Sequence, residues 1–348
     1  MSHITSLDRM MTTLQLKEPD RVPFLCNPSM HAARALGVSL KDYFTSPEHV
    51  VSGQLLIRKH LETDAYFSFH YGAVEYEAFG GDVIFREDGP PNSSRPVISN
   101  QDQITDVQIP DIENTPCLEQ VLETTQRIRK ESPGDAPILG ISISPISLPV
   151  MLMGFEAYLQ LMLGDPDRFA DLMKITTSFC IKWSQAQVKA GANAIVYFDP
   201  VSSPTIIPPA LYKETGYQIA KEVIAKVRAP VITAFASGAC LPILDLVTET
   251  GTIGVIVSEK EDLAEIKNRC QGKITVLGNL SDIAMHRWSI DEARRTVKEA
   301  VRKGAPGGGY IMIDSHSEIP LQVPCEVLKT IRDTVHTYGR YPIAIDDT

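Results

Sequence analysis

Short apolar segments rich in β-branched residues alternate with stretches of helical periodicity from residue 20 to residue 336. This alternation is typical of repeated strand–helix units. Because the segments are apolar on both faces, they predict a parallel sheet that is covered by helices. We expect eight strands, at Val22–Leu25, Ala65–Phe67, Ile138–Ile141, Ala194–Phe198, Val231–Ala234, Gly254–Val257, Ile274–Gly278 and Tyr310–Ile313.

Eight strands of this kind favour an α/β fold that closes into a single (β/α)8 TIM barrel over residues 1–348. Two long helices are expected at Phe169–Ala190 and Ala210–Val227, each preceded by proline, which is tolerated in a first helical turn. One insertion interrupts the alternation of strand and helix segments. Its glycine and proline turn signals predict a β-hairpin at 75–97, after the second strand.

The charge balance limits the classes of partner. The 348 residues carry a formal charge of −10, and no run of Lys or Arg is longer than a pair. This composition argues against a nucleic acid or an anionic membrane surface as partner. No apolar stretch is long enough to cross a membrane. The six cysteines are widely spread without a CxxC pair, and the N-terminal segment does not resemble a signal peptide, so we expect a cytoplasmic protein with reduced thiols.

Candidate site residues follow from the barrel expectation, because active sites of such barrels lie at the C-terminal ends of the strands. Asp199 directly follows five apolar residues, and Asp314, His316 and Glu318 alternate in one short stretch. None of the candidates is Arg or Lys, which disfavours a polyanionic substrate. The full set of candidates is Asn27, His70, Tyr71, Ser142, Ser144, Asp199, Ser237, Asn279, Asp314, His316 and Glu318.

Each candidate also has a purely structural interpretation. Ser and Asn after a strand often form turns or helix caps, and Asp199 could cap the segment that follows it. His70 could be a core histidine with both nitrogens satisfied, and the 314–318 loop could be a solvated rim. There is no HxH, HExxH or closely spaced cysteine pair, so no metal site is expected.

Four segments resemble the uroporphyrinogen decarboxylase superfamily and, within it, most of all the methylcobalamin-dependent methyltransferases. They are Arg9–Pro23 (RMMTTLQLKEPDRVP), Asp64–Gly80 (DAYFSFHYGAVEYEAFG), Gly278-Asn279-Leu280 and Val323–Ile331 (VPCEVLKTI). The resemblance extends over nearly the whole chain. It implies a single (β/α)8 barrel, in agreement with the strand pattern.

Two departures from the superfamily pattern narrow the expected function. The decarboxylases bind porphyrinogen carboxylates with an arginine-containing loop after the first strand, where this chain has FLCNPS at 24–29. The methylcobalamin:coenzyme M enzymes hold zinc with a His-x-Cys-Gly motif after strand five and a Cys after strand eight. The corresponding residues here are Phe235, Ser237 and His316, so no zinc is expected.

Loss of the zinc ligands indicates a different methyl acceptor. Zinc makes a thiol reactive by favouring the thiolate, which an amine acceptor does not need. A reduced pterin offers a neutral N5 atom and a ring edge of N–H donors that suits carboxylates. The resemblance therefore implies a zinc-free methyltransferase that moves a methyl group from methylcobalamin, carried on a corrinoid protein, to tetrahydrofolate.

The expected roles follow from this chemistry. Asp199 would anchor the pterin, with Asp314 or Glu318 as a second anchor, and His316 or His70 would take the N5 proton. Neutral hydrogen-bond partners would be Asn27, Ser237 and Asn279. Three alternatives stay open: a thiol methyltransferase with an unusual metal site, a porphyrinogen decarboxylase, and a binding subunit without catalysis.

Overall fold

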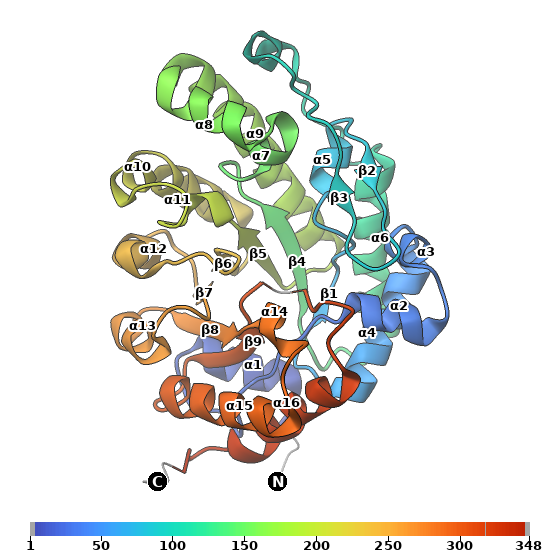
Figure 1. Ribbon diagram of the computed structural model, residues 1–348, viewed down its shortest axis with the longest axis vertical. Helices are drawn as coiled ribbons and strands as arrows, with labels where there is room; N and C mark the ends of the chain where they lie inside the picture. The colour runs from blue at the N-terminus through green and yellow to red at the C-terminus, as the bar shows by residue number, and fades with distance from the viewer. Residues whose placement is uncertain (1–3, 317, 345–348) are drawn as a thin grey trace.

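A curled parallel sheet lies at the centre of the molecule and is surrounded by helices (Figure 1). The computed structural model describes residues 4–316 and 318–344. The sheet has seven strands in the order β1-β4-β5-β6-β7-β8-β9, and all neighbours are parallel. These are β1 (Tyr66–Phe67), β4 (Ile138–Ile143), β5 (Ala194–Phe198), β6 (Val231–Ala234), β7 (Gly254–Ile256), β8 (Thr275–Leu280) and β9 (Tyr310–Asp314).

The first of the eight expected strands is a single bridge. Phe24 pairs in parallel with Met312 of β9, and the Leu25 N–H donates to the Met312 carbonyl at 2.8 Å. On its other side, the Phe24 carbonyl accepts from the Asp64 N–H at 2.7 Å, just before β1. The curled sheet is therefore TIM-barrel-like, with seven strands and one bridging segment in place of eight full strands. The expectation of one domain over residues 1–348 stays a prediction.

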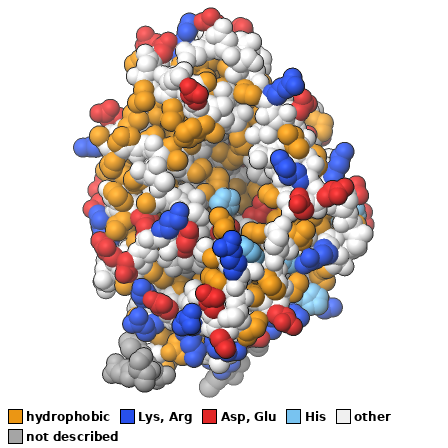
Figure 2. Space-filling view, viewed as in Figure 1, with side chains coloured by type: hydrophobic (Ala, Val, Ile, Leu, Met, Phe, Trp, Pro, Cys, Tyr) orange, Lys and Arg blue, Asp and Glu red, His pale blue; other side chains and the backbone are white. Residues whose placement is uncertain are grey.

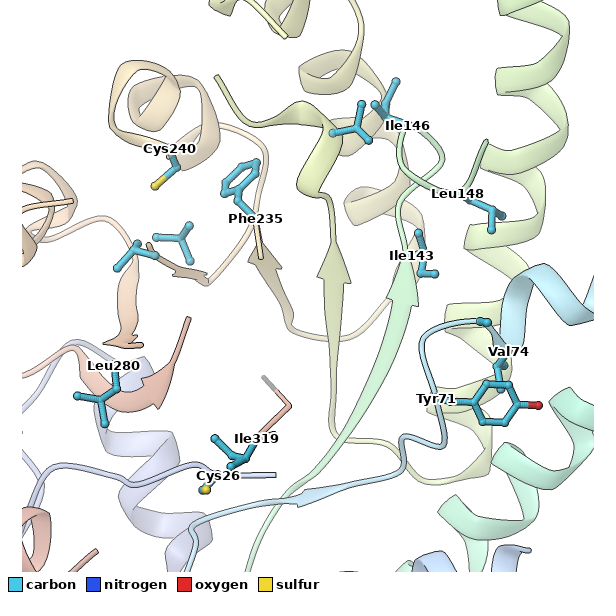
Figure 3. Packing of buried hydrophobic residues seen from close by; sticks show 14 of the residues in the cluster. Cys26, Tyr71, Val74, Ile143, Ile146, Leu148, Phe235, Cys240, Leu280 and Ile319 are labelled. Carbon is cyan, nitrogen blue, oxygen red and sulfur yellow. The ribbon is translucent and has the colours of Figure 1, made fainter. Parts of the chain in front are cut away.

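Both faces of the sheet are apolar, as the sequence pattern predicts. Val196 and Ile232 point inward with side chains from the other strands, while Tyr197 and Val231 pack outward against helices. At the strand ends, Ile143, Phe235 and Leu280 belong to a larger cluster that fills the space beneath the loops (Figure 3).

The helices cover the outer face of the sheet (Figure 1). None of them, within the residues that the structure describes, is long and apolar enough to cross a membrane. They are α1 (Ser6–Leu14), α2 (Ser29–Leu36), α3 (Leu40–Phe44), α4 (Pro47–Leu61), α5 (Val74–Ala78), α6 (Pro116–Glu131), α7 (Leu148–Met153), α8 (Phe155–Gly164), α9 (Pro166–Ala190), α10 (Pro209–Glu214), α11 (Gly216–Val227), α12 (Leu244–Thr248), α13 (Leu263–Cys270), α14 (Asp282–Met285), α15 (Ile290–Gly304) and α16 (Cys325–Tyr338). Short 3-10 helices are η1 (Gln101–Asp106), η2 (Pro200–Ser202) and η3 (Leu241–Ile243).

Two expectations about local structure need correction. The helix expected at 210–227 is divided at Thr215 into α10 and α11. The segment 75–97 begins with helical residues, because α5 occupies 74–78. Further along, β2 (Val83–Ile84) pairs antiparallel with β3 (Asn92–Ser93).

A buried ionic network ties the N-terminal helix to the start of β1. Asp64 is fully buried and accepts hydrogen bonds from Arg9 and Arg21, both at 2.7 Å, and from the Phe24 N–H at 2.8 Å. Burial alone would raise the pKa of Asp64, but the positive charges of Arg21 and Arg9 bring it below its ordinary value. Asp64 is therefore ionised and holds the bridging segment beside β1.

Candidate active site

A cavity of about 290 Å³ opens at the C-terminal ends of β4 and β5. Its walls are mostly apolar and include Ile141, Ile143 and Phe198, with Met151 from α7. His316 and Glu318 are the ionisable side chains in its described lining, which contains no Lys, Arg or Cys. Figure 2 shows the hollow in this face of the molecule, with hydrophobic side chains around it.

Glu318 is the carboxylic acid of this cavity. It accepts a hydrogen bond from the Ser29 hydroxyl at 3.2 Å. Burial raises the pKa of Glu318 to about 7, helped by the nearby Asp282 and opposed by Ser29. Glu318 can therefore gain or lose a proton near neutral pH, which is the property of a general acid or base.

His316 lies at the exposed edge of the same cavity. Its ring makes an edge contact with the Phe198 ring, with 6.0 Å between the centroids, and its backbone N–H donates to Asp314 Oδ1 at 3.1 Å. Asp282, which is 4% exposed, lies close to His316. Burial raises the pKa of Asp282, while His316 lowers it and Glu259 raises it. The loop after β9 thus brings His316 and Glu318 to the cavity, whereas Asp314 lies outside its lining and receives the His316 N–H.

Asp199 does not line the cavity. It is 1% exposed and accepts hydrogen bonds from the Ser144 hydroxyl at 2.5 Å and from the Ser147 hydroxyl at 2.9 Å. Burial raises the pKa of Asp199, although the serines favour its charged form. In this structure Asp199 joins the loops after β4 and β5. Asp199 and Ser144 therefore lie outside the lining of the cavity, and the pterin contact expected of Asp199 and the substrate contact expected of Ser144 stay predictions.

Ser237 and Asn279 hold the loops after β6 and β8. The Ser237 N–H donates to the Ser315 carbonyl at 3.1 Å, and the Ser258 hydroxyl donates to the Ser237 carbonyl at 2.9 Å. Asn279 donates through Nδ2 to the Ser258 carbonyl at 3.1 Å. Ala236 and Ser237 have positive φ angles of 48° and 61°, which costs about 1–2 kcal/mol per residue. These hydrogen bonds support the strained turn, and neither predicted residue reaches the cavity lining.

Asn27 and Ser142 are also engaged by protein partners. Asn27 Oδ1 accepts from Gln54 at 2.9 Å, and the Ser142 hydroxyl lies 3.4 Å from the Cys180 sulfur. Both residues are buried and neither lines the cavity. Ser142 faces Cys180 of α9 and Asn27 faces Gln54 of α4, and the substrate contacts expected of both residues stay predictions.

His70 and Tyr71 are core residues. The His70 ring nitrogens lie 2.8 Å from the Phe44 carbonyl and 2.8 Å from the Thr124 hydroxyl. Burial lowers the pKa of His70 to about 4, so the ring stays neutral. The Tyr71 hydroxyl donates to Glu77, and its ring packs beside Val74 (Figure 3). Both nitrogens of His70 thus have protein partners, as the structural interpretation expects, and its substrate contact stays a prediction.

Sequence reasoning missed Glu75, the second residue of α5. It is 4% exposed, and its Oε1 accepts from the Ile143 N–H at 2.8 Å at the end of β4. Its Oε2 and the indole N–H of Trp183 have no hydrogen-bond partner of normal geometry among the described residues. Burial raises the pKa of Glu75 to about 8, against smaller opposing effects of the Ile143 N–H, Trp183 and Ser142. The only signal in the sequence was an acidic residue between the apolar Val74 and Tyr76.

The described residues contain no group of three or more His, Cys, Asp or Glu side chains arranged to hold a metal ion. Of the positions that correspond to zinc ligands by resemblance, Phe235 is a buried core side chain and Ser237 supports the turn after β6. Cys240 lies nearby, but its sulfur is 3.5 Å from Glu261 Oε2 and burial raises the pKa of its thiol.

Fold and cavity together define a barrel-like α/β protein with its candidate site at the carboxyl ends of the strands. The chain belongs to the uroporphyrinogen decarboxylase (URO-D) family, an enzyme family whose model matches residues 5–338. Relatives include the uroporphyrinogen decarboxylase of Actinobacillus pleuropneumoniae serotype 5b (strain L20), which is 26% identical over 276 residues, or 76% of each chain. That of Actinobacillus succinogenes is 25% identical over 325 residues, or 90% of each chain.

Solved structures confirm the type of fold. A methyltransferase from Methanosarcina mazei superposes with a TM-score of 0.86 at 20% identity, covering 96% of this chain and 99% of the other. A B12-independent methionine synthase from Shewanella sp. W3-18-1 superposes with a TM-score of 0.55 at 11% identity, covering 93% and 98%. At these identities the likeness concerns the fold.

Proposed function

We propose that this protein transfers a methyl group from a methyl-Co(III) corrinoid, carried by a partner protein, to N5 of tetrahydrofolate without zinc. The observation that carries the proposal is the cavity: its described lining is mostly apolar, bears His316 and Glu318, and contains no Lys, Arg or Cys. The fold shared with a protein described as a methyltransferase adds support.

The same cavity argues against the activity named for the curated relatives. A porphyrinogen carries several carboxylates, and burying them without positive partners is strongly unfavourable. Here the ionisable groups in the described lining are Glu318 and His316, and Asp282 adds further negative charge nearby. A neutral, largely flat ligand fits this environment better than a polyanion.

In the proposed reaction the N5 lone pair attacks the methyl carbon while the carbon–cobalt bond breaks. The bonding pair stays on cobalt, which leaves as Co(I), and the N5 proton passes to Glu318. A group with a pKa near the working pH is suited to this transfer. The apolar walls position the ring, and such positioning can contribute about 7–11 kcal/mol to lowering the barrier.

Exposed apolar side chains in the segments that follow the strands fit a protein that delivers the corrinoid. Phe155 of α8, Ile206 after η2, Ile283 of α14 and Ile84 of β2 are large and exposed, and each lies in a segment that follows a strand of the barrel. Hydrophobic side chains are also visible around the hollow in Figure 2. Exposed apolar surface of this kind is typical of protein interaction sites.

The test is an anaerobic assay with chelator-treated protein, methylcobalamin and one of two acceptors, tetrahydrofolate or a thiol of the coenzyme M type. We expect that the corrinoid loses its methyl group when tetrahydrofolate is the acceptor, but not when the thiol is. The absorbance of the corrinoid monitors the reaction. Glu318→Gln should slow the reaction, while Glu326→Gln, an exposed control on α16, should not. Activity only with the thiol, restored by zinc, or release of CO2 from a porphyrinogen would refute the proposal.

A further inference from the structure

A small side pocket adjoins the main cavity where β1 and β4 diverge. Its volume is about 20 Å³, enough for one water molecule. The side pocket and the main cavity share four wall residues, Phe69, Gly72, Ile141 and Ile143. Phe69 is half-buried and lines both spaces. Phe69 is therefore one of the side chains that lie between the side pocket and the main cavity.

Glu75 and Trp183 are among the residues that line the side pocket. Both side chains are more than nine-tenths buried, with exposures of 4% and 1%. The Ile143 N–H donates to Glu75 Oε1 and fixes the carboxyl group. The indole N–H of Trp183 and the Ser142 hydroxyl lie close enough to this carboxyl group to favour its charged form, but neither makes a hydrogen bond of normal geometry with Oε2. Buried polar atoms without a well-formed hydrogen bond are rare in proteins, because each costs about 1–3 kcal/mol.

We propose that the side pocket recognises the lactam edge of the pterin ring, an inference that rests on the proposed function. Glu75 Oε2 accepts from the ring N3–H, and the Trp183 indole donates to the adjacent C4 oxygen. A carboxylate oxygen beside an N–H is the complement of an amide-like edge, which carries a donor next to an acceptor. Phe69 turns aside to admit the ring. Glu75 thereby takes the anchoring role that the sequence suggested for Asp199.

When the pterin ring donates its N3–H to Glu75, the carboxyl group of Glu75 is ionised. Since burial raises its pKa to about 8, the free carboxyl holds a proton at neutral pH and releases it when the ring binds. The other titratable groups around the side pocket are His70 and Tyr71 before α5, and Cys180 faces the carboxyl from α9. Burial keeps all three neutral near pH 7. The described lining of the side pocket contains no Lys or Arg.

The experiment compares two ligands and two variants by calorimetry at pH 7. Tetrahydrofolate has the lactam edge, whereas its 4-amino-4-deoxy analogue reverses donor and acceptor there. The parent protein should bind tetrahydrofolate about ten to a hundred times more tightly than the analogue, the range expected when buried polar groups are mismatched. It should release about one proton with tetrahydrofolate, measured by repeating the titration in buffers of different ionisation enthalpy.

Glu75→Gln keeps the shape of the side chain and the acceptor for the Ile143 N–H, but presents an NH2 group to the ring. This variant should lose most of the preference for tetrahydrofolate and release no proton. Glu119→Gln, which removes an exposed carboxyl from α6 outside the lining of the side pocket, is the control and should behave as the parent. Thermal melting of each variant verifies that it is folded.

A second measurement observes the indole directly. With 15N-labelled tryptophan, tetrahydrofolate should shift the indole N–H resonance of Trp183 and leave that of Trp288, the only other tryptophan, in place. Equal affinity for both ligands, an unchanged preference in Glu75→Gln, or a stationary Trp183 resonance would overturn the side-pocket proposal even if methyl transfer to tetrahydrofolate is observed. Conversely, absence of methyl transfer with the ligand preference intact would refute the proposed function and leave this site standing.

Discussion

Replacing the buried carboxyl of Glu75 by an amide should stabilise the protein, increasingly so as the pH rises. In the unfolded chain Glu75 ionises with its ordinary pKa of 4.5, whereas in the folded protein burial raises that pKa to about 8. Between these values the folded state holds a proton that the unfolded state has lost. The contribution of Glu75 to stability is therefore fully present below pH 4.5 and is lost as the pH rises through 8.

The size of the effect follows from the two pKa values. Each pH unit between them removes about 1.4 kcal/mol from the free energy of unfolding, so the total approaches about 5 kcal/mol above pH 8. Glu75→Gln cannot ionise and keeps the hydrogen bond from the Ile143 N–H. The difference in unfolding free energy between variant and parent should therefore grow from pH 5 to pH 8 and then level off.

Urea denaturation of both proteins at half-unit pH steps, followed by circular dichroism, measures this difference. Glu119→Gln, which removes an exposed carboxyl from α6, controls for the loss of one negative charge from the whole chain. A gap between the Glu75→Gln variant and the parent that stays constant from pH 5 to pH 8 would show that Glu75 is already ionised in the folded protein. The reasoning about its burial would then be wrong.

Three further predictions address other parts of the molecule. Asp64→Asn should lower the free energy of unfolding by about 3–5 kcal/mol, because it leaves Arg9 and Arg21 without their buried counter-charge. Denaturant titrations measure this loss, and a value below about 1 kcal/mol would show that the buried ionic network contributes little to stability. The rate of methyl transfer should rise with pH through about 7 in the parent protein, but not in Glu318→Gln. Profiles of rate against pH measure this difference, and identical profiles for the two proteins would exclude Glu318 as the base. Deleting residues 88–94, which follow β2 and include β3, should raise the apparent KM for the corrinoid protein but not for free methylcobalamin. An unchanged KM would remove this segment from the docking surface.

Most of the fold could be predicted from the sequence. Seven of the eight expected segments form strands within one or two residues of their expected bounds, because runs that are apolar on both faces are stable only inside a covered parallel sheet. The absence of Lys and Arg from the strand ends was likewise visible in the sequence. The described lining of the cavity also contains no Lys or Arg, because the C-terminal ends of the strands meet at one end of the barrel.

Only the tertiary structure decided which polar groups face the cavity. Asp199 follows β5 as expected, but its carboxyl accepts from the Ser144 and Ser147 hydroxyls and is not part of the cavity lining. Glu75, in contrast, reaches the Ile143 N–H, 68 residues further along the chain. The direction of a side chain after a strand depends on the loop conformation and on partners distant in sequence. Periodicity therefore fixes where the strands end, while contacts between loops determine which side chains line the site.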